Sequence, residues 1–168
     1  MEAWSIHHLI KEANRQGNLS KESIIDLQCY AQNLIKNDVP VIFTLMHLAF
    51  ITNLNYDFLY GTVSRRFDKS NYRMFSIRKR NGKHRFIHAA IKNLHILHNY
   101  INKEILKNIP IHPCAYAFNR NGGILKCAQK HCGCEWLLQF DLKDFFFSIT
   151  ESNVYNVFKS IGYKDILA

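Results

Sequence analysis

The sequence lacks an apolar run long enough to cross a membrane. Its most apolar stretch, residues 39–50, is interrupted by Thr44 and His47, whereas a transmembrane helix needs about 20 predominantly apolar residues. We see no targeting segment either. With 48% hydrophobic residues in a chain of 168, the protein is apolar enough to fold and long enough to bury the core of one domain. We therefore expect a folded chain with no membrane partner.

The sequence also lacks an even set of cysteines. Its five cysteines follow no secretory signal, which favours reduced thiols in the cytoplasm over a disulfide framework. Cys127, Cys132 and Cys134 cluster with His131, but zinc sites usually pair two C-x2–4-C units, and this spacing differs. We interpret these cysteines as small buried residues, and a metal site here is the less favoured alternative.

Acidic residues are scarce in the middle of the chain. Residues 65–107 contain 12 Lys and Arg but only 2 Asp and Glu, whereas residues 1–64 contain 4 and 6, and residues 108–168 contain 6 and 5. Essentially all of the formal charge of +9 therefore lies in this one basic block. Such a block is typical of a surface that binds a phosphate backbone. The alternative is a solvated basic face without a ligand.

The first 55 residues predict helices, and their residue types favour core packing over chemistry. Apolar residues recur at helical spacing over residues 3–14 and again after Ser20, a suitable N-cap for the second helix. Pro40 suits the first turn of a third helix that runs to about Thr52. Residues 56–73 then follow as connecting sequence that turns basic.

A β-hairpin is predicted at residues 72–87. Asn81-Gly82 separates two runs of alternating residues, which is a strong local signal for a hairpin turn. Phe75 and Ile77 would share a face of the first strand, and Arg85 and Ile87 a face of the second. At least five cationic side chains lie near the tip, where guanidinium groups could bind phosphates.

The remaining sequence alternates helical patterns with loops. Residues 89–109 predict one long helix, residues 125–131 a short one, and Thr150 begins a last helix that Gly162 ends. Residues 136–140 form an apolar run that predicts a buried strand, and Asp141 follows it directly. A carboxylate at the end of a buried strand needs a partner, such as a metal ion.

Four pieces of the sequence resemble one family in matching order: three segments and the Gly162-Tyr163 pair that follows them. From Asp141 to Ile149, an Asp, a spacer, a Phe-Phe pair and an Ile resemble the first catalytic motif of reverse transcriptases of the bacterial retron and group II intron type. The predicted hairpin is similar to that family's fingers motif. Residues 114–124 resemble its next motif, although Ala117 stands where Gly is usual and Gly123 where Ser is usual. The resemblance covers about residues 60–163.

The resemblance implies roles for particular residues. Asp141 would be a ligand shared by two Mg²⁺ ions, with the Leu142 carbonyl as a further ligand. Arg85 would bind the triphosphate of the incoming nucleotide, helped by Lys79 or Lys83. The backbone of Asp144 and Phe145 would follow the triphosphate, and the Phe146 ring would exclude a 2′-hydroxyl. The residues that would contact nucleic acid are Arg65, Arg66, Arg78, Arg80, Phe118 and Asn119.

Alternatives to these roles stay open. Asp144 could be a carboxylate of a loop or helix start, and Phe145 and Phe147 could pack in the core. The resemblance also leaves open a non-catalytic RNA-binding module and, as the least favoured reading, an unrelated basic α/β fold.

The expected fold class is α+β. Residues 1–55 would form a helical N-terminal region, and residues 56–168 a partial reverse-transcriptase domain with a fingers β-hairpin and the first part of the palm. The implied function is addition of deoxynucleotides to a primer on an RNA template. The implied partners are a structured RNA, deoxynucleotides and a separately encoded effector in phage defence. The sequence has no Tyr-x-Asp-Asp motif, so we expect that these 168 residues alone do not polymerise.

Overall fold

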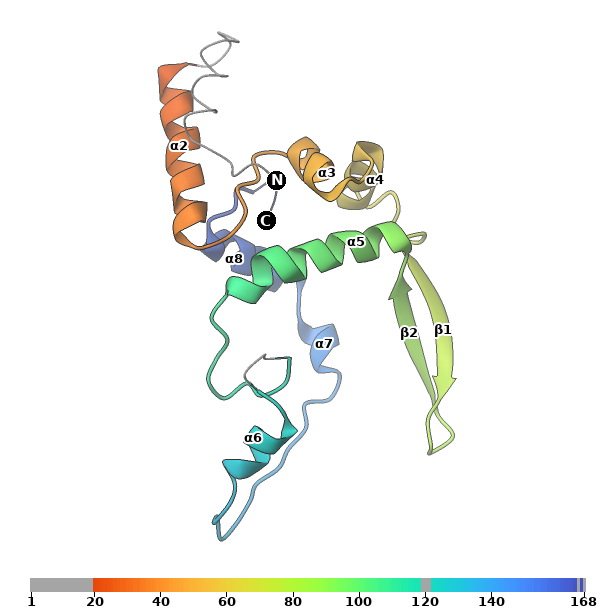
Figure 1. The fold of residues 1–168 in the computed structure, drawn as a ribbon. Coiled ribbons are helices and arrows are strands. Elements are labelled where there is room, and N and C mark those ends of the chain that lie inside the picture. Colours follow the sequence, from red (N-terminus) through yellow and green to blue (C-terminus); the bar gives the residue numbers. More distant parts are fainter. Residues whose placement is uncertain (1–19, 119–121, 166, 168) are drawn as a thin grey trace. The chain divides into compact units, whose positions relative to one another are not determined.

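The computed structural model describes residues 20–118, 122–165 and 167. These residues form helices and one antiparallel hairpin, which agrees with the α+β class (Figure 1). The helix predicted over residues 3–14 lies outside the described part. None of the described helices is both long and apolar enough to cross a membrane. In chain order the elements are α2 (Lys21–Lys36), α3 (Leu45–Thr52), α4 (Tyr56–Val63), β1 (Tyr72–Arg78), β2 (His84–Ala90), α5 (Lys92–Tyr100), α6 (Ile124–Gln129), α7 (Phe145–Ser148) and α8 (Glu151–Ile161).

The chain divides into two compact units. The first comprises Met1–Asn108 with Tyr155–Ala168, and the second comprises Ile109–Val154. The basic hairpin therefore belongs to the first unit and Asp141 to the second. The predicted boundary near residue 55, between a helical N-terminal region and a partial reverse-transcriptase domain, stays a prediction.

One part of the first unit's core joins α2 to the C-terminal segment. Ser20 caps α2 as predicted, because its Oγ accepts a hydrogen bond from the Ser23 N–H at 3.1 Å. At the other end of α2, the Asn37 side chain donates to the Ile161 carbonyl at 2.7 Å. The Tyr163 hydroxyl donates to the Pro40 carbonyl at 2.8 Å, and its ring is buried. These bonds join residues more than 120 positions apart.

A second part of this core is built from α3, α4 and α5. Leu45, Ala49 and Leu59 are buried there, and Leu97 of α5 packs against them. The predicted start of α3 at Pro40 is wrong, since the helix begins at Leu45. Thr44 is the actual N-cap, because its hydroxyl accepts from the His47 N–H at 3.1 Å.

The structure adds a helix that the sequence analysis treated as connecting sequence. α4 follows Asn55, whose side chain accepts hydrogen bonds from the Asp57 and Phe58 N–H groups. The long helix predicted over residues 89–109 is wrong at its start, because β2 extends to Ala90. α5 then continues as a π-helical stretch, Ile101–Ile105, and a 3-10 turn, Leu106–Asn108.

The predicted hairpin is confirmed. β1 and β2 pair antiparallel, with Phe75 opposite Ile87 and Ile77 opposite Arg85. The Lys79 N–H donates to the Lys83 carbonyl at 2.7 Å, and the Gly82 N–H donates to the Lys79 carbonyl at 3.0 Å. Gly82 has φ of +79°, a conformation that glycine adopts without strain. The turn is therefore a loop of three residues between Lys79 and Lys83, closed by a glycine in the left-handed region.

The predicted strand at residues 136–140 is wrong. The segment has no regular secondary structure, and Trp136, Leu138 and Phe140 are exposed by 79, 70 and 77%. Strand pairing requires a neighbour, and the described residues provide this segment with none. The predicted burial of the cysteines is also wrong, because four of the five are exposed and Cys127 is half-buried.

Candidate nucleotide and nucleic-acid interface

The hairpin tip presents a dense group of cations. The side chains of Lys79, Arg80 and Lys83 lie in or beside the turn and are exposed. No acidic side chain of the described residues forms an ion pair with them. The turn itself is fixed by its backbone bonds and by the Asn81 side chain, which accepts from the Lys83 N–H at 3.2 Å. Such a tip attracts phosphate groups and holds its donors on a defined backbone.

Arg85 lies on the more apolar face of the hairpin. Residues directly opposite each other in an antiparallel pair project to the same face, so Arg85 and Ile77 share a face with Phe75 and Ile87. Phe75 and Ile77 are each half exposed. The register therefore confirms the predicted faces of both strands, and the Arg85 side chain is exposed. Arg78 lies on the opposite face, across from His84.

The two predicted nucleic-acid contacts before the hairpin have defined surroundings. Arg65 follows α4 with φ of +61°. Arg66 lies with its guanidinium carbon 5.3 Å from the centre of the Tyr60 ring, and its Nε donates to the Ser64 hydroxyl at 3.4 Å. The Arg66 side chain is therefore ordered by an aromatic ring of α4 rather than by an acidic partner.

Asp141 and the residues after it form an exposed loop in the second unit. Asp144 adopts the left-handed conformation, with φ of +54° and ψ of +34°, and precedes the four residues of α7. This conformation is uncommon outside glycine, although Asp tolerates it better than most residues. The Asp144 side chain does not cap α7, and its carbonyl accepts from the Phe147 N–H at 2.9 Å. The turn thus changes the chain direction directly after the Asp141 segment.

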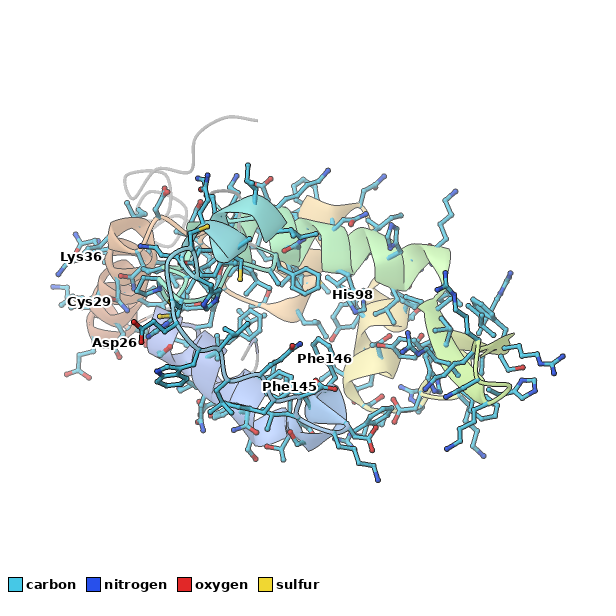
Figure 2. All side chains as sticks on the ribbon, turned by 90° about the horizontal axis from the view of Figure 1, so that it is seen from below. Asp26, Cys29, Lys36, His98, Phe145 and Phe146 are labelled. Atoms are coloured by element: carbon cyan, nitrogen blue, oxygen red, sulfur yellow. The ribbon has the colours of Figure 1, made fainter. Side chains whose placement is uncertain are left out.

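The three phenylalanines of α7 are exposed. The Phe145 and Phe146 rings meet edge to face with centroids 5.6 Å apart (Figure 2). Phe145, Phe146 and Phe147 are exposed by 49, 74 and 86%, so the packing alternative for Phe145 and Phe147 is wrong for the described residues. An exposed aromatic side chain at Phe146 is available to a ligand.

The segment at residues 114–124, which resembles the motif after the fingers hairpin, is partly described. Phe118 is 98% exposed and has φ of +57°, while Asn119 lies outside the described residues. Phe118 lines an apolar hollow together with Ile124, Cys127 and His131. Gly123, with φ of +120°, directly precedes α6, and its N–H donates to the Tyr116 carbonyl at 2.9 Å.

No complete metal site is present in the described part of the chain. No three side chains of His, Cys, Asp or Glu lie together there in a way that could hold an ion. Asp141 offers carboxylate oxygens, the ligand type that Mg²⁺ prefers, and the adjacent Leu142 carbonyl is of the same type. These donors have the right chemistry but do not complete the coordination of Mg²⁺, which is near octahedral.

Two aromatic residues near the basic block were missed by the sequence analysis. Tyr56 and Tyr60 lie one helical turn apart on α4, and their rings stack with centroids 6.1 Å apart and an interplanar angle of 20°. The available signal was Asn55 as an N-cap, followed by aromatic residues at positions i and i+4.

Comparison with known proteins identifies relatives for a little more than half of the chain. The retron Ec86 reverse transcriptase of Escherichia coli is 30% identical over 99 residues, 58% of this chain and 31% of that protein. The retron Mx65 and Mx162 reverse transcriptases of Myxococcus xanthus are 32 and 28% identical, over 55 and 57% of this chain and 22 and 20% of those proteins. No protein-family model matches. The chain thus matches less than a third of the length of each of these relatives.

Proposed function

This chain is related to the retron reverse transcriptases, and from that premise we propose that it provides the fingers and the first part of the palm of an RNA-directed DNA polymerase. The supporting observation is that its 30% identity to a retron enzyme is accompanied by an ordered basic hairpin that carries Arg85. The proposal covers deoxynucleotides as substrates and a structured RNA as template and primer. It also includes a cytoplasmic location and a separately encoded effector.

Arg85 is proposed as the ligand of the incoming triphosphate. Its guanidinium group carries several donors in a fixed plane and is always charged, which suits phosphate oxygens. Phe75, Ile77 and Ile87 lie on the same face of the hairpin, and the exposed Arg85 side chain is accessible to a ligand. Lys79 and Lys83 at the tip would supply further positive charge for the same phosphates.

Asp141 and Phe146 are proposed as the palm's contribution. Two Mg²⁺ ions, when bound, would stabilise the attacking and leaving oxygens of the transferred phosphate. The described residues supply at most part of that metal site, so we assign no step through the metal. Phe146 would contact the sugar, where a ring at the 2′ position leaves no room for a hydroxyl. Asp144 and Phe145 would bring their backbone to the triphosphate.

The proposal is tested with a chimera in which residues 60–163 replace the matching segment of the Ec86 enzyme. We expect DNA synthesis on an RNA template, and a loss of about a hundredfold or more for Asp141→Asn, because the carboxylate ligand is gone. Lys143→Gln changes a neighbouring charge without removing a carboxylate and should stay within a fewfold of the parent. A chimera that folds but makes no product would contradict the proposal.

The isolated chain is expected not to polymerise. Residues 1–168 contain no Tyr-x-Asp-Asp motif, and the described residues contain no complete metal-binding group. A primer-extension assay with the purified chain, an RNA template, deoxynucleotides and Mg²⁺ should therefore give no templated product. Template-dependent extension by the chain alone would disprove this expectation.

A second candidate function is RNA binding without synthesis. It is favoured by the cations of the hairpin tip, which form no ion pairs within the described part of the chain. In that case Asp141→Asn leaves RNA affinity unchanged, and affinity falls steeply as salt concentration rises. An active parent chimera that loses synthesis through Asp141→Asn would favour the polymerase instead.

A further inference from the structure

We propose that α4 and the turn after it form a stacking site for an unpaired base of a nucleic-acid strand. Its members are Tyr56, Tyr60 and Arg66. The site lies outside the residues proposed for the deoxynucleotide and the metal, and its argument does not depend on catalysis.

The three side chains form one stack, in which the Tyr60 ring contacts both other members. The Tyr56 and Tyr60 rings are nearly parallel, with centroids 6.1 Å apart. The Arg66 guanidinium carbon lies 5.3 Å from the centre of the Tyr60 ring. Aromatic rings and guanidinium planes are the groups on which proteins stack unpaired bases, because every base offers a π-face regardless of sequence.

The local fold orders this surface before any ligand arrives. Asn55 caps α4, which fixes the start of the helix at Tyr56. Gly61 contacts the Phe67 ring so closely that a Cβ at Gly61 would overlap it. The Phe67 N–H also donates to the Gly61 carbonyl at 3.2 Å. Phe67 thus holds the turn that carries Arg66 against the helix, which reduces the backbone ordering that binding would otherwise require.

The exposure of these tyrosines separates them from the structural tyrosines of the same unit. Tyr30 and Tyr163 are 8 and 2% exposed, and each donates its hydroxyl to a backbone carbonyl. Tyr56 and Tyr60 are 39 and 47% exposed. Within the described part of the chain, their hydroxyls have no hydrogen-bond partner. Core packing therefore does not account for the Tyr56–Tyr60 pair.

The positive charge near the stacking site favours a nucleic-acid ligand. Arg66 lies in the block of residues 65–107, with 12 cationic and 2 acidic side chains. A strand of nucleic acid offers both a base for the rings and phosphates for this charge. A paired duplex has its bases stacked within the helix and offers no free base face. The inferred ligand is therefore single-stranded, either an RNA template or a DNA product.

The test measures binding of labelled oligouridylate of about 12 nucleotides, a length within the range of single-strand sites. We expect Tyr60→Leu to weaken binding about five- to hundredfold, because the stack that supports the base loses the ring that contacts both other members. Tyr60→Phe retains the ring and should bind as the parent does. Phe50→Leu removes an 85% exposed ring from neighbouring α3 and serves as the matched control. The thermal unfolding of every variant is compared with the parent.

The salt dependence separates stacking from phosphate contact. Tyr60→Leu should leave the slope of log affinity against log salt unchanged, whereas loss of a phosphate contact changes it by about 0.7 for a single strand. Oligodeoxythymidylate shows whether DNA is accepted as well as RNA, and a loss on either strand supports the site. Equal affinities of Tyr60→Leu and Tyr60→Phe for both strands would overturn it, whatever the outcome of the polymerase assays.

Discussion

Gly162 illustrates how a single residue determines the closure of the first unit. It has φ of +113°, and a Cβ there would overlap the side-chain amide of Asn33 on α2. The bonds from Asn37 to Ile161 and from Tyr163 to Pro40 lie on either side of it. Two demands therefore coincide at this position: a left-handed backbone and a close approach of α8 to α2.

We expect Gly162→Ala to destabilise the chain by about 2 kcal/mol or more, because a left-handed non-glycine residue costs about 1–2 kcal/mol before any steric overlap is counted. Urea unfolding measures the loss. Adding Asn33→Ala removes the overlapping amide from an exposed position of α2. The double variant should therefore regain the stability lost to the steric overlap, but not the stability lost to the left-handed backbone. A double variant as unstable as Gly162→Ala would show that the overlap contributes nothing.

The buried Tyr163 predicts a loss of stability at high pH. Burial raises the pKa of the Tyr163 hydroxyl, so the folded state retains this proton more strongly than the unfolded chain does. Its contribution to stability is complete below the unfolded pKa of about 10 and is lost as the pH rises above that value. The parent should therefore show an unfolding free energy that changes little through this group up to about pH 10 and decreases above that pH.

Tyr163→Phe isolates this effect from the other groups that titrate at high pH. The variant should lose about 1 kcal/mol at neutral pH with the hydrogen bond to Pro40. Above about pH 10, the free energy of unfolding of Tyr163→Phe should decrease less than that of the parent. Parallel pH profiles of the two proteins would contradict the assignment.

At the scale of elements, turn and cap residues in the sequence correctly predicted the hairpin and the helices that short-range hydrogen bonds stabilise. The Asn-Gly turn located the hairpin, and the caps Ser20 and Thr150 located α2 and α8. α4 was missed because Gly61 and the β-branched residues after it lower helix propensity in a helix of only eight residues. The start of α3 was wrongly predicted at Pro40, because proline suits an irregular segment as well as a first helical turn.

The hairpin is the element on which the RNA-binding prediction depends. Changing Lys79, Arg80 and Lys83 to Gln together should lower the salt slope of RNA binding by up to about 2, since each phosphate contact contributes about 0.7. Changing Lys21 and Lys36 of α2 to Gln, outside the basic block, should leave the slope within error. Fluorescence anisotropy over a salt series provides the measurement. Equal slopes for all three proteins would exclude the tip as a phosphate contact.

For the whole molecule, the exposed segment at residues 136–142 has the largest consequence. Its apolar composition predicted a buried strand, but burial requires packing partners that are distant in sequence. The described residues supply none, so Leu138 and Phe140 remain exposed. The same limit applies to the proposed site: the resemblance implies that Arg85 and Asp141 act on one nucleotide, and because each lies in its own compact unit, their joint action stays a proposal.

We expect the purified chain to self-associate through this segment as its concentration rises, because large exposed apolar patches promote association. Changing Leu138 and Phe140 to Lys should shift the chain toward the monomer in sedimentation velocity. Phe50→Lys, at a single exposed ring on α3, should shift it much less. If the double variant and the parent associate equally, another surface is responsible.

The bonds between α2 and the C-terminal segment also matter during synthesis on the ribosome. Asn37 and Pro40 emerge early, but their partners Ile161 and Tyr163 are translated more than 120 codons later. At about 5–20 residues per second, roughly 6 to 25 s pass before these bonds can form. Throughout that interval the end of α2 lacks the C-terminal partners that cover it in the folded chain. Slow codons before residue 161 would lengthen this interval without changing a single amino acid.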